Sequence, residues 1–594
     1  MRRIVLFLLI VFVLSSNLLA AHITVEQATQ KARHYLASIG KSEVDLQQAS
    51  FTAALSRNDD MACELSLYVF DLGHNEGFMI LSGDDTLPEV LCYTDHGRFC
   101  YDELPANARF WIDSYARQIA QLQQSSEADS IASGIEIHDS IAPLLTSCWD
   151  QDGPYNDKCP MFFNGNRSMT GCMATAMAQV LYYYRDKSVS SLQAEIPSYD
   201  CATLYSYGRI HVDGFAAEAP IAWDNMLDRY DGQATEVQKE AVATLMAYCG
   251  ASIEMNYRDD LNGGSTSSEI SIPTALRKYF GYSSDVKVKY RDNFSDDNWD
   301  RLIYRELMNG RPVILSGKDV SGHGHAFVCD GYDGMGLYHI NWGWGGLADG
   351  YYLMSKLQPS QQGIGGFGKA YDFFLGAVVG MHPGNEEPFV DQLRLTVTQL
   401  SEPNDTTYFS SLSDIVKCNY HFVQENRTAS TRSFEFALAL FQNGEYIRNL
   451  ITGVAKDVTK TSFLTSEGYF EWLANTWVKG VGVGNYQLKL VSRVQGSEEW
   501  LLNEGSDDWY IDLTITDNMV GFAAHQFVEP EITLGIDSIP DAGNTDVGIK
   551  TLHHQISTDA VYSLTGRRLS NNSADIKGLP AGIYVVGKRK IIVK

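Results

Sequence analysis

A cysteine stands at the start of an apolar helical pattern, in the stretch TGCMATAMAQVLYYY from Thr170 to Tyr184. Thr170 and Gly171 are typical of a helix cap, and the apolar residues after them recur at helical spacing. The positive end of a helix dipole favours a thiolate, which is the nucleophilic form of cysteine. Cys172 is therefore either an inert packed thiol, the commoner state of a free cysteine, or a nucleophile.

A cysteine nucleophile needs a base, and the base needs a group that orients it. The glycine-rich, strand-like stretch SGHGHAFVCDGYDGMGLYHINWGWGG contains three histidines, which are His323, His325 and His339. A hairpin in this stretch would bring Asn341 close to His325, and Trp342 and Trp344 would cover their hydrogen bond.

This arrangement of cysteine, histidine and asparagine has three interpretations. The order of cysteine, distant histidine and asparagine is that of papain-like peptidases. The His-x-His pair of residues 323 and 325 could instead be half of a metal site, although no acidic or histidine ligand follows at a helpful spacing. A single histidine in a glycine-rich strand is more often structural, and periodicity does not favour His325 over His323 or His339.

The elements that must position these residues divide into blocks. Residues 22–138 combine helical patterns with strand-like pieces such as SLYVFDL and GFMILSGDD, and they end in a polar tail at 125–139 that suits cleavage. Residues 139–383 have helices in their first half and glycine-rich strands in their second half. Helices followed by strands predict an α+β domain.

The C-terminal third has strand alternation. Residues 384–520 include FEFALALFQNGEYI, in which Asn443-Gly444 is a hairpin signal, and they predict a β-sandwich. A linker at 521–544 precedes a small β-domain at 545–594 with three predicted strands.

The N-terminus, MRRIVLFLLIVFVLSSNLLAA, has two arginines before a short apolar run. This pattern predicts a secretory signal peptide at residues 1–21, because the apolar run is too short to anchor the chain in a membrane. No later apolar run is long enough to span a membrane.

Composition narrows the function. The 594-residue chain has a net charge of -27, which argues against nucleic-acid binding because no basic surplus exists to neutralise phosphates. Its 10 cysteines contain no C-x-x-C pair, so a structural zinc site made of cysteines is not expected. We expect no metal and no organic cofactor.

Four motifs in this order resemble the streptopain-like cysteine peptidases, secreted bacterial enzymes with a papain-like fold: WDQDGPYN (149–156), TGCMATAMAQVLYYY (170–184), HGHAFVCDGYD (323–333) and NWGWGG (341–346). The first block is similar to that family's inhibitory propeptide, through GFMILSGDDTLPEVLCY and ELPANARFWIDSYA. The resemblance implies a papain-like catalytic domain at 139–383.

The resemblance also implies roles for individual residues. Cys172 matches the nucleophile, and His325 matches the histidine that acts first as base and then as acid. Asn341 and Trp342 match the element that positions and shields this histidine. Gln151 matches the glutamine that forms the oxyanion hole with the backbone N–H of Cys172. His323 is interpreted as a bystander.

Two further parts have family interpretations. The loop LNGGSTSSEIS (261–271) corresponds to a glycine-serine-rich segment near the substrate cleft, which makes Gly264, Ser265 and Ser267 candidate substrate-binding residues. The C-terminal VYSLTGRRL...GLPAGIYVVGKRKIIVK resembles a sorting domain of the type IX secretion system, whose machinery would be a partner. A plain terminal β-domain is the alternative.

The sequence thus predicts a secreted cysteine endopeptidase, made as a zymogen and found outside the cell or on the outer-membrane surface. Its partners would be protein or peptide substrates and its own propeptide as an intramolecular inhibitor. Two alternatives stay open. One is a Cys-His amide hydrolase or transpeptidase acting on the cell wall. The other is a surface binding or adhesion protein whose papain-like domain is degenerate.

Overall fold

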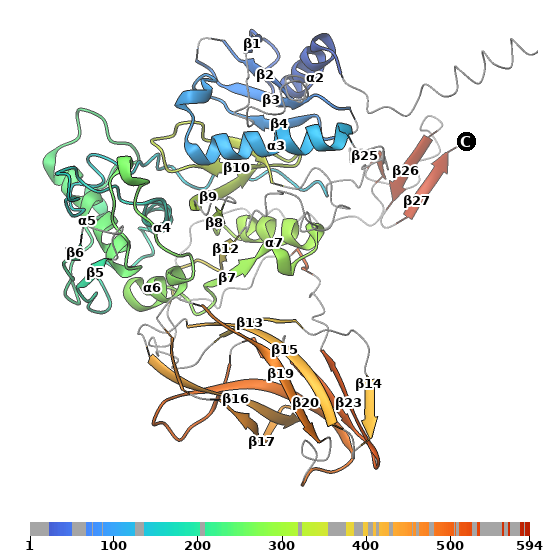
Figure 1. Cartoon of the computed structure of the whole chain (residues 1–594). Helices are drawn as coiled ribbons and strands as arrows, with labels where there is room; N and C mark the ends of the chain where they lie inside the picture. The colour runs from blue at the N-terminus through green and yellow to red at the C-terminus, as the bar shows by residue number, and fades with distance from the viewer. Residues whose placement is uncertain are drawn as a thin grey trace, which may run out of the picture.

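A computed structural model gives the architecture of the chain (Figure 1). It describes residues 23–49, 67–73, 75–85, 87–124, 136–201, 208–318, 324–354, 376–384, 396–401, 408–411, 415–426, 432–453, 455–458, 463–473, 480–503, 505–506, 510–524, 532–534, 561–563, 568–570, 582–586 and 589–593. The predicted signal peptide, residues 125–135 of the predicted cleavage tail, residues 525–531 and 535–544 of the predicted linker at 521–544, and His323 lie outside these residues.

The N-terminal block contains two helices and four short strands. The predicted first helix is present as α2 (Val25–Ser38), which begins with a capping box at Thr24. The other elements are β1 (Gln47–Ala49), β2 (Leu67–Asp71), β3 (Phe78–Ser82), β4 (Val90–Tyr93), a 3-10 turn η1 (Tyr101–Glu103) and α3 (Ala106–Gln124). The strands SLYVFDL and GFMILSGDD are confirmed as β2 and β3.

The central block is helical first and strand-rich afterwards, as predicted. Its helices are α4 (Cys172–Tyr183), α5 (Glu236–Ser252), α6 (Ser271–Phe280) and α7 (Asp296–Met308), with 3-10 turns η2 (Trp223–Asn225), η3 (Asp260–Asn262) and η4 (Arg291–Asn293). Its strands are β5 (Tyr199–Cys201), β6 (Ile210–Val212), β7 (Lys287–Tyr290), β8 (Val313–Lys318), β9 (Gly324–Tyr332), β10 (Leu337–Asn341), β11 (Gly350–Leu353) and β12 (Gly376–Val379).

The two blocks share one sheet. Its ten strands run in the order β1-β2-β3-β4-β11-β10-β9-β8-β12-β7. The junction is the antiparallel pair of β4 and β11, in which Tyr351 faces Tyr93 and Tyr352 faces Cys92. The N-terminal block therefore extends the central sheet by four strands, as the blue and yellow-green arrows in Figure 1 show.

Each face of the central sheet has its own hydrophobic core. Phe327 and Cys329 of β9 pack in the core that contains α3 and α7, whereas Ala326 and Val328 pack in the core that contains α4, α5 and α6. This alternation is what a pleated strand buried on both faces produces. The face that carries α3 is called the propeptide face below, and the face that carries α4 is called the α4 face.

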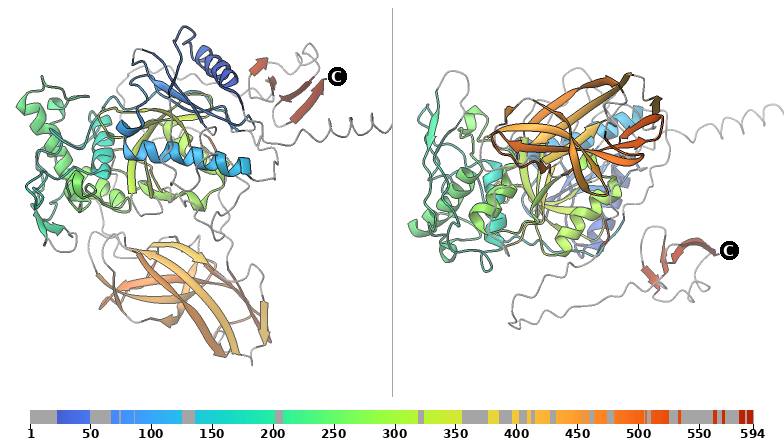
Figure 2. Two further views of the ribbon diagram at one scale, coloured as in Figure 1. Left: turned by 45° about the horizontal axis from the view of Figure 1, so that its top comes forward. Right: turned by 90° about the horizontal axis from the view of Figure 1, so that it is seen from below.

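Most later strands form two antiparallel sheets that pack on each other (Figure 2). One contains β13 (Thr396–Ser401), β15 (Ile415–Glu425) and β19 (Phe463–Leu473). The other contains β14 (Tyr408–Ser411), β16 (Arg432–Gln442), β17 (Glu445–Thr452), β18 (Lys456–Val458), β20 (Gly484–Val494), β21 (Leu501–Leu502), β22 (Ile511–Ile515) and β23 (Met519–Ala524).

Two details of the C-terminal third differ from the sequence prediction. The strand β23 runs to Ala524, so the predicted sandwich boundary at 520 cuts a strand that pairs with β22 and β14. The last block has four strands rather than three: β24 (Val561–Ser563), β25 (Arg568–Ser570), β26 (Gly582–Val586) and β27 (Arg589–Val593). The Asn443-Gly444 hairpin is confirmed, since both residues have positive φ between β16 and β17.

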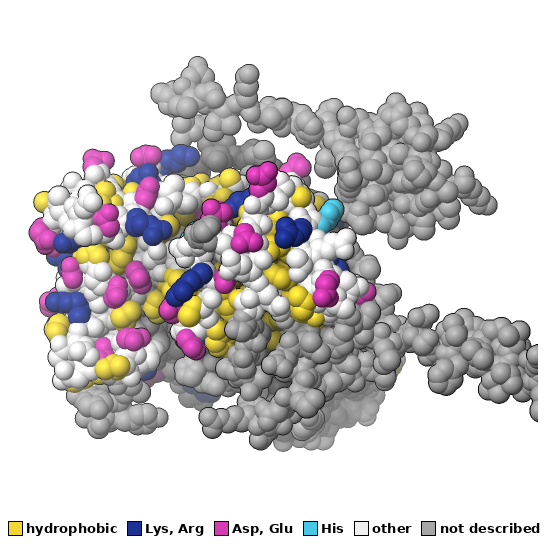
Figure 3. All heavy atoms as spheres, turned by 90° about the horizontal axis from the view of Figure 1, so that it is seen from above, with side chains coloured by type: hydrophobic (Ala, Val, Ile, Leu, Met, Phe, Trp, Pro, Cys, Tyr) yellow, Lys and Arg dark blue, Asp and Glu magenta, His cyan; other side chains and the backbone are white. Residues whose placement is uncertain are grey.

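The visible surface carries charged side chains of both signs. On the face seen from above in Figure 3, acidic and basic side chains are mixed over the described residues. Among the described helices, none is both long and apolar enough to cross a membrane.

Candidate active site

Cys172 is the first residue of α4, as the sequence predicts. The N-cap is Gly171, which has a φ of 87° and no side-chain capping bond. A Cβ atom at Gly171 would come within 2.7 Å of the Met255 methyl carbon and 3.1 Å of the Ser265 carbonyl oxygen. Only glycine accepts both this φ and this approach, so the residue before Cys172 fixes where the helix begins.

The Cys172 thiol lies against β9. Its side chain is partly exposed and packs beside the core on the α4 face. Burial raises the pKa of this thiol above its ordinary value, while the nearby backbone of Ala326, Met173 and Cys172 itself acts in the opposite direction. The backbone at the start of α4 therefore favours the thiolate, and burial opposes it.

Gln151 lies beside the nucleophile helix. Its carbonyl oxygen accepts a hydrogen bond of 3.0 Å from the N–H of Thr170, two residues before Cys172. The Gln151 side chain is 5% exposed, and its Nε2 is buried without a hydrogen-bond partner among the described residues. An unpaired buried donor costs free energy, so it is suited to an oxygen atom that arrives with a substrate.

His325 lies at the start of β9, opposite Gly317 of β8. The β8–β9 pairing is regular from Val313 to Lys318, and the His325 side chain is partly buried. Cys172 packs in the core that contains Ala326, the residue after His325. The structure therefore brings the start of α4 next to the part of β9 that begins beside His325.

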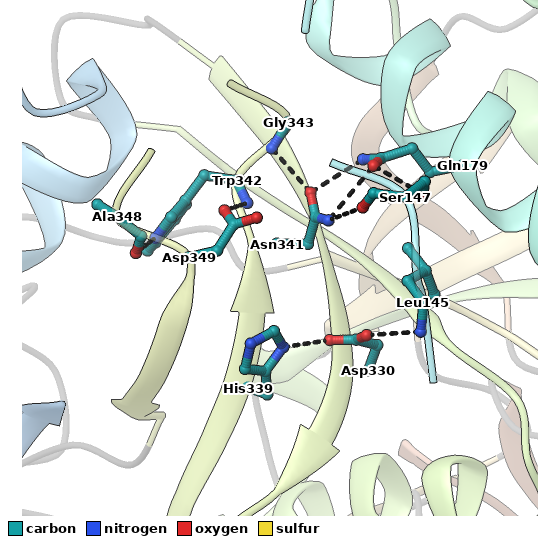
Figure 4. A network of polar contacts seen from close by, with 10 residues as sticks. All are labelled: Leu145, Ser147, Gln179, Asp330, His339, Asn341, Trp342, Gly343, Ala348 and Asp349. Carbon is teal, nitrogen blue, oxygen red and sulfur yellow. Dashed lines mark hydrogen bonds and ion pairs between the residues drawn. The ribbon is translucent and has the colours of Figure 1, made fainter. Parts of the chain in front are cut away.

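Asn341 is on the α4 face and has partners that the sequence did not predict (Figure 4). Its Oδ1 accepts hydrogen bonds from Gln179 Nε2 (2.9 Å) and from the Gly343 N–H (3.0 Å), and its Nδ2 donates to the Ser147 carbonyl (2.8 Å). In the β9–β10 register Asn341 faces Val328, three residues past His325. The expected Asn341–His325 hydrogen bond is not among these contacts.

Trp342 is in a different place from the one predicted. Its side chain is 1% exposed on the propeptide face, where it packs against Phe327, Tyr352 and the propeptide residue Trp111 at centroid distances of 4.7, 5.1 and 6.4 Å. Its indole N–H donates to the Ala348 carbonyl (3.0 Å). Asn341 is on the opposite face, so Trp342 does not shield a bond of Asn341 in this structure.

A second polar group surrounds His339. Its Nδ1 is 2.6 Å from Asp330 Oδ1, and Asp330 Oδ2 accepts a hydrogen bond from the Leu145 N–H (2.9 Å). A bulge between His339 and Ile340 in the β9–β10 register brings these two side chains together. Burial lowers the pKa of His339, but the adjacent Asp330 outweighs this effect and raises it. His339 is thus committed to a structural ion pair.

The predicted substrate loop has mostly structural contacts. Ser265 is buried, and its hydroxyl donates to the carbonyl of Met169 (2.6 Å) and accepts from the N–H of Arg258 (2.9 Å). Ser267 donates to the Ile253 carbonyl (2.7 Å). Gly264 has a φ of +71° and open space around its Cα. The hydroxyls of Ser265 and Ser267 therefore hold the loop next to Gly171, whereas Gly264, like Gly263, has open space beside it.

The sequence analysis missed Gln179, which is fully buried on α4. Its Oε1 accepts hydrogen bonds from the Ser147 hydroxyl (3.0 Å) and the Trp149 N–H (3.2 Å). One signal could have identified it: a polar residue seven positions after Cys172 in an apolar helix lies on the same helical face as the nucleophile. Among the described residues, no group of three or more potential metal ligands occurs.

Two family patterns match the chain. That of the Peptidase C10 family matches residues 149–352, and that of the Spi protease inhibitor matches residues 20–119. These ranges contain the candidate active site and most of the N-terminal block that extends the sheet.

Two named proteins are similar to this chain over much of its length. The chain is 34% identical over 337 residues to streptopain of Streptococcus pyogenes, a match that covers 54% of this chain and 81% of streptopain. It is 28% identical over 459 residues to the thiol protease/hemagglutinin PrtT of Porphyromonas gingivalis, which covers 73% of this chain. The chain spans 51% of the length of PrtT.

Among solved structures, a prointerpain A fragment of Prevotella intermedia is 30% identical, covers 58% of this chain and 99% of that fragment, and has a TM-score of 0.46. Active interpain A cysteine protease of the same species is 36% identical over 41% of this chain and 99% of that protein, with a TM-score of 0.34. The family patterns and the streptopain match show that this chain belongs to the Peptidase C10 family of cysteine proteases and carries an inhibitor-type propeptide, as a zymogen does.

Proposed function

We propose that the whole chain is a secreted cysteine endopeptidase zymogen in which Cys172 is the nucleophile, His325 the acid-base and Gln151 an oxyanion donor. The Cys172 thiolate attacks a peptide carbonyl carbon, and the carbonyl electrons move to the oxygen, which the Gln151 amide and the Cys172 N–H stabilise. The tetrahedral intermediate expels the amine, which takes a proton from His325, and leaves a thioester. Water then gives a proton to His325 and releases the acid and the thiolate.

One observation carries this proposal. Cys172 is the first residue of α4, where the backbone N–H groups have no partner within the helix, and the Gln151 segment, whose buried amide nitrogen has no partner among the described residues, is tied by its backbone to Thr170. A structural buried cysteine needs neither feature, because a packed thiol is a weak donor that requires no fixed hydrogen bonds. Gly171, whose geometry excludes other residues, fixes the position of this sulfur.

The same arrangement supports latency. Phe327 of β9, two residues after His325, packs against Trp111 of the propeptide helix α3 at a centroid distance of 6.0 Å, and burial raises the Cys172 pKa. We propose that cleavage in the tail at 125–139 releases the propeptide and activates the pair of Cys172 and His325. Residues 136–147 are held by Arg301–Glu136 (2.7 Å) and by the Ile141–Tyr332 bridge, which favours cleavage before Glu136 over cleavage near Ile141.

The remaining parts of the proposal concern export. The N-terminal residues 1–21 would direct secretion, and the C-terminal block that includes β24–β27 would act as a type IX sorting domain, so the enzyme would act outside the cell or at the outer-membrane surface. Protein or peptide substrates and the secretion machinery would be its partners. The motifs of the sequence support this part of the proposal.

The test compares residues 22–594 with a Cys172→Ala variant. Both chains are followed on gels over time, with mass spectrometry of the fragments, and assayed on casein with and without a thiol-directed epoxide. We expect only the native chain to cleave within residues 125–141, to degrade casein and to carry the epoxide on Cys172.

A native chain that stays whole is activated by limited proteolysis before the assay. If it then neither degrades casein nor takes up the epoxide, the peptidase proposal is wrong. Ligation or deamidation products without new peptide termini would instead favour the transpeptidase or amide-hydrolase alternative.

A further inference from the structure

Three buried polar side chains form a closed group beneath the nucleophile, on three separate parts of the chain. Gln179 belongs to α4, Asn341 ends β10, and Ser147 lies in the segment that leads to Gln151 (Figure 4). Their exposed fractions are 0% for Gln179, 4% for Asn341 and 2% for Ser147. Buried polar groups are stable only when they bond each other, so this group must be satisfied internally.

The orientation of both amides is fixed by backbone donors. The N–H of Trp149 can only donate, so the atom of Gln179 that faces it at 3.2 Å is the oxygen. The N–H of Gly343 likewise identifies the Asn341 atom at 3.0 Å as Oδ1. The Gln179 Nε2 then donates to Asn341 Oδ1 at 2.9 Å, and the Ser147 hydroxyl donates to Gln179 Oε1 at 3.0 Å. These contacts leave no freedom to flip either amide.

This polar group connects the chain segments that carry the residues of the proposed reaction. Gln179 lies two turns after Cys172 on one face of α4. Through Ser147 and Trp149 it holds the segment whose next residues include Gln151, and through Asn341 it holds the start of the Gly343 loop. Gly343 lies so close to α4 that a Cβ atom there would be 3.3 Å from Thr175 Cγ2. A shift of Gln179 would therefore change the distance between the thiol and the oxyanion donor.

We propose that Gln179 is a positioning residue of this peptidase: its amide sets the placement of the Gln151 segment and of Asn341 relative to Cys172. This inference depends on the proposed function, since it assigns Gln179 a part in that reaction. Gln179 touches no substrate in this assignment. Its effect is expected in kcat, because transition-state stabilisation depends on geometry more steeply than substrate binding does.

The experiment uses the activated chain with the variants Gln179→Met and Gln179→Glu. Methionine has a similar shape but neither donor nor acceptor, and glutamate keeps an acceptor for Ser147 and Trp149 while it loses the donor to Asn341. The matched control is Val180→Ala, the neighbouring fully buried residue of α4, which is outside the polar group. For each variant, active sites are titrated with a thiol-directed epoxide, and kcat, KM and the thermal midpoint are measured on one peptide substrate.

We expect Gln179→Met to lower kcat per titrated thiol by about tenfold or more, with KM changed by less than about threefold. Val180→Ala should lower the thermal midpoint and keep kcat per titrated thiol. In an Asn341→Ala background, Gln179→Met should cost less than it does in the unmodified chain, because the Gln179–Asn341 bond is already lost and only the bonds to Ser147 and Trp149 remain to be broken. If Gln179→Met is not recovered folded, Ser147→Ala, which removes one donor to Gln179, should lower kcat about two- to fivefold.

Each outcome decides the inference. Unchanged kcat per titrated thiol in Gln179→Met, or in Ser147→Ala, makes Gln179 a purely structural residue and overturns the proposal. Full additivity with Asn341→Ala overturns it as well. If the unmodified activated chain hydrolyses the substrate and the variants match it, only this inference fails. If the unmodified chain is inactive, the proposed function fails first and the inference with it.

Discussion

The two β-rich regions that flank the catalytic part are attached to it in opposite ways. The N-terminal strands pair with the catalytic sheet through β4 and β11, and α2 and α3 share its core. The strands from Thr396 to Ala524 form separate sheets, and the described contact from the following segment to the catalytic part is the hydrogen bond from the Ile532 N–H to Asn298 Oδ1 (3.2 Å). The N-terminal block is thus part of the catalytic sheet and its core, whereas the later strands have sheets of their own.

The contacts of the propeptide explain why its removal would change the catalytic part. Trp111 of α3 packs against Phe327 and Trp342 at centroid distances of 6.0 and 6.4 Å, and its indole N–H donates to the Leu353 carbonyl of β11. Tyr35 of α2 donates to Asp333 (3.0 Å). Phe327 lies on β9 with His325, Trp342 directly follows Asn341 at the end of β10, and Asp333 directly follows β9. The docked propeptide therefore contacts the chain next to both candidate residues.

Breaking the Trp111 contact is expected to have the largest effect. In a Cys172→Ala background, which prevents self-cleavage, Trp111→Ala should destabilise the docked propeptide by about 3 kcal/mol or more, because a large buried aromatic side chain leaves a cavity. In the active chain the same change should shorten the lag before casein hydrolysis. Thermal unfolding and the time course measure these effects.

The matched control is Trp500→Ala, in the separate β-sheets, where Trp500 packs beside Arg493. It should leave both the lag and the unfolding of the catalytic part unchanged. An equal effect of both substitutions would remove the distinction between the two attached regions.

The reactivity of Cys172 should also differ before and after propeptide release. The raised pKa of the buried thiol leaves little thiolate at pH 7 in the intact chain, because an acid with a higher pKa is more protonated at a given pH. Alkylation by iodoacetamide at pH 7 should therefore be about tenfold or more slower before cleavage than after it. Rates are measured by mass spectrometry of the Cys172 peptide. Equal rates in both forms would contradict a role of docking in thiol activation.

A third prediction concerns pH and the propeptide residue His96. Its Nε2 is 2.8 Å from the Gly346 carbonyl of the catalytic part, and its hydrogen bond to Asp95 raises its pKa above 6.5, against an opposing effect of burial. Asp349 and His339 are the other charged groups near this contact, and burial raises the pKa of Asp349 to about 6. Among the groups that raise the His96 pKa, the Gly346 carbonyl and Asp349 belong to the catalytic part, so the protonated imidazole stabilises docking through these two groups.

The direction of the pH dependence of docking follows from the raised pKa of His96. The contribution of His96 is complete below pH 6.5, the ordinary value, and is lost as the pH rises through the higher folded value. We expect His96→Gln to weaken docking about two- to fivefold at pH 5.5 and to have no effect at pH 8.5. The dissociation of a separately added propeptide from the Cys172→Ala catalytic part gives this measurement. A loss of equal size at both pH values would exclude protonation as the cause.

The smallest effect is expected from removing the separate β-rich region. A chain that ends after Gly384 keeps the hydrogen bond from the Gly384 N–H to the Gly281 carbonyl (3.1 Å), which closes the catalytic part. Its kcat/KM on casein should stay within about twofold of that of the full chain, because no described contact of the later sheets reaches the active site. A tenfold loss would show that these sheets take part in catalysis or in substrate binding.

The sequence by itself determined the local elements. Gly171 and the apolar spacing after it predicted a helix that begins at Cys172, and strand-like stretches predicted β2, β3 and β9. Asn443-Gly444 predicted its hairpin. Each of these features depends on residues a few positions apart, whose periodicity and turn chemistry are written in the chain.

Only the tertiary structure decided which side chains meet. Gln179 bonds Asn341 across 162 residues, and Trp111 of the propeptide packs on Trp342, so the tryptophan predicted to shield a catalytic hydrogen bond is buried on the opposite face. The pairing of His325 with Gly317 depends on the register of β9 against β8. Strand register and the choice of a distant partner arise from the packing of the whole sheet, and no local pattern encodes them.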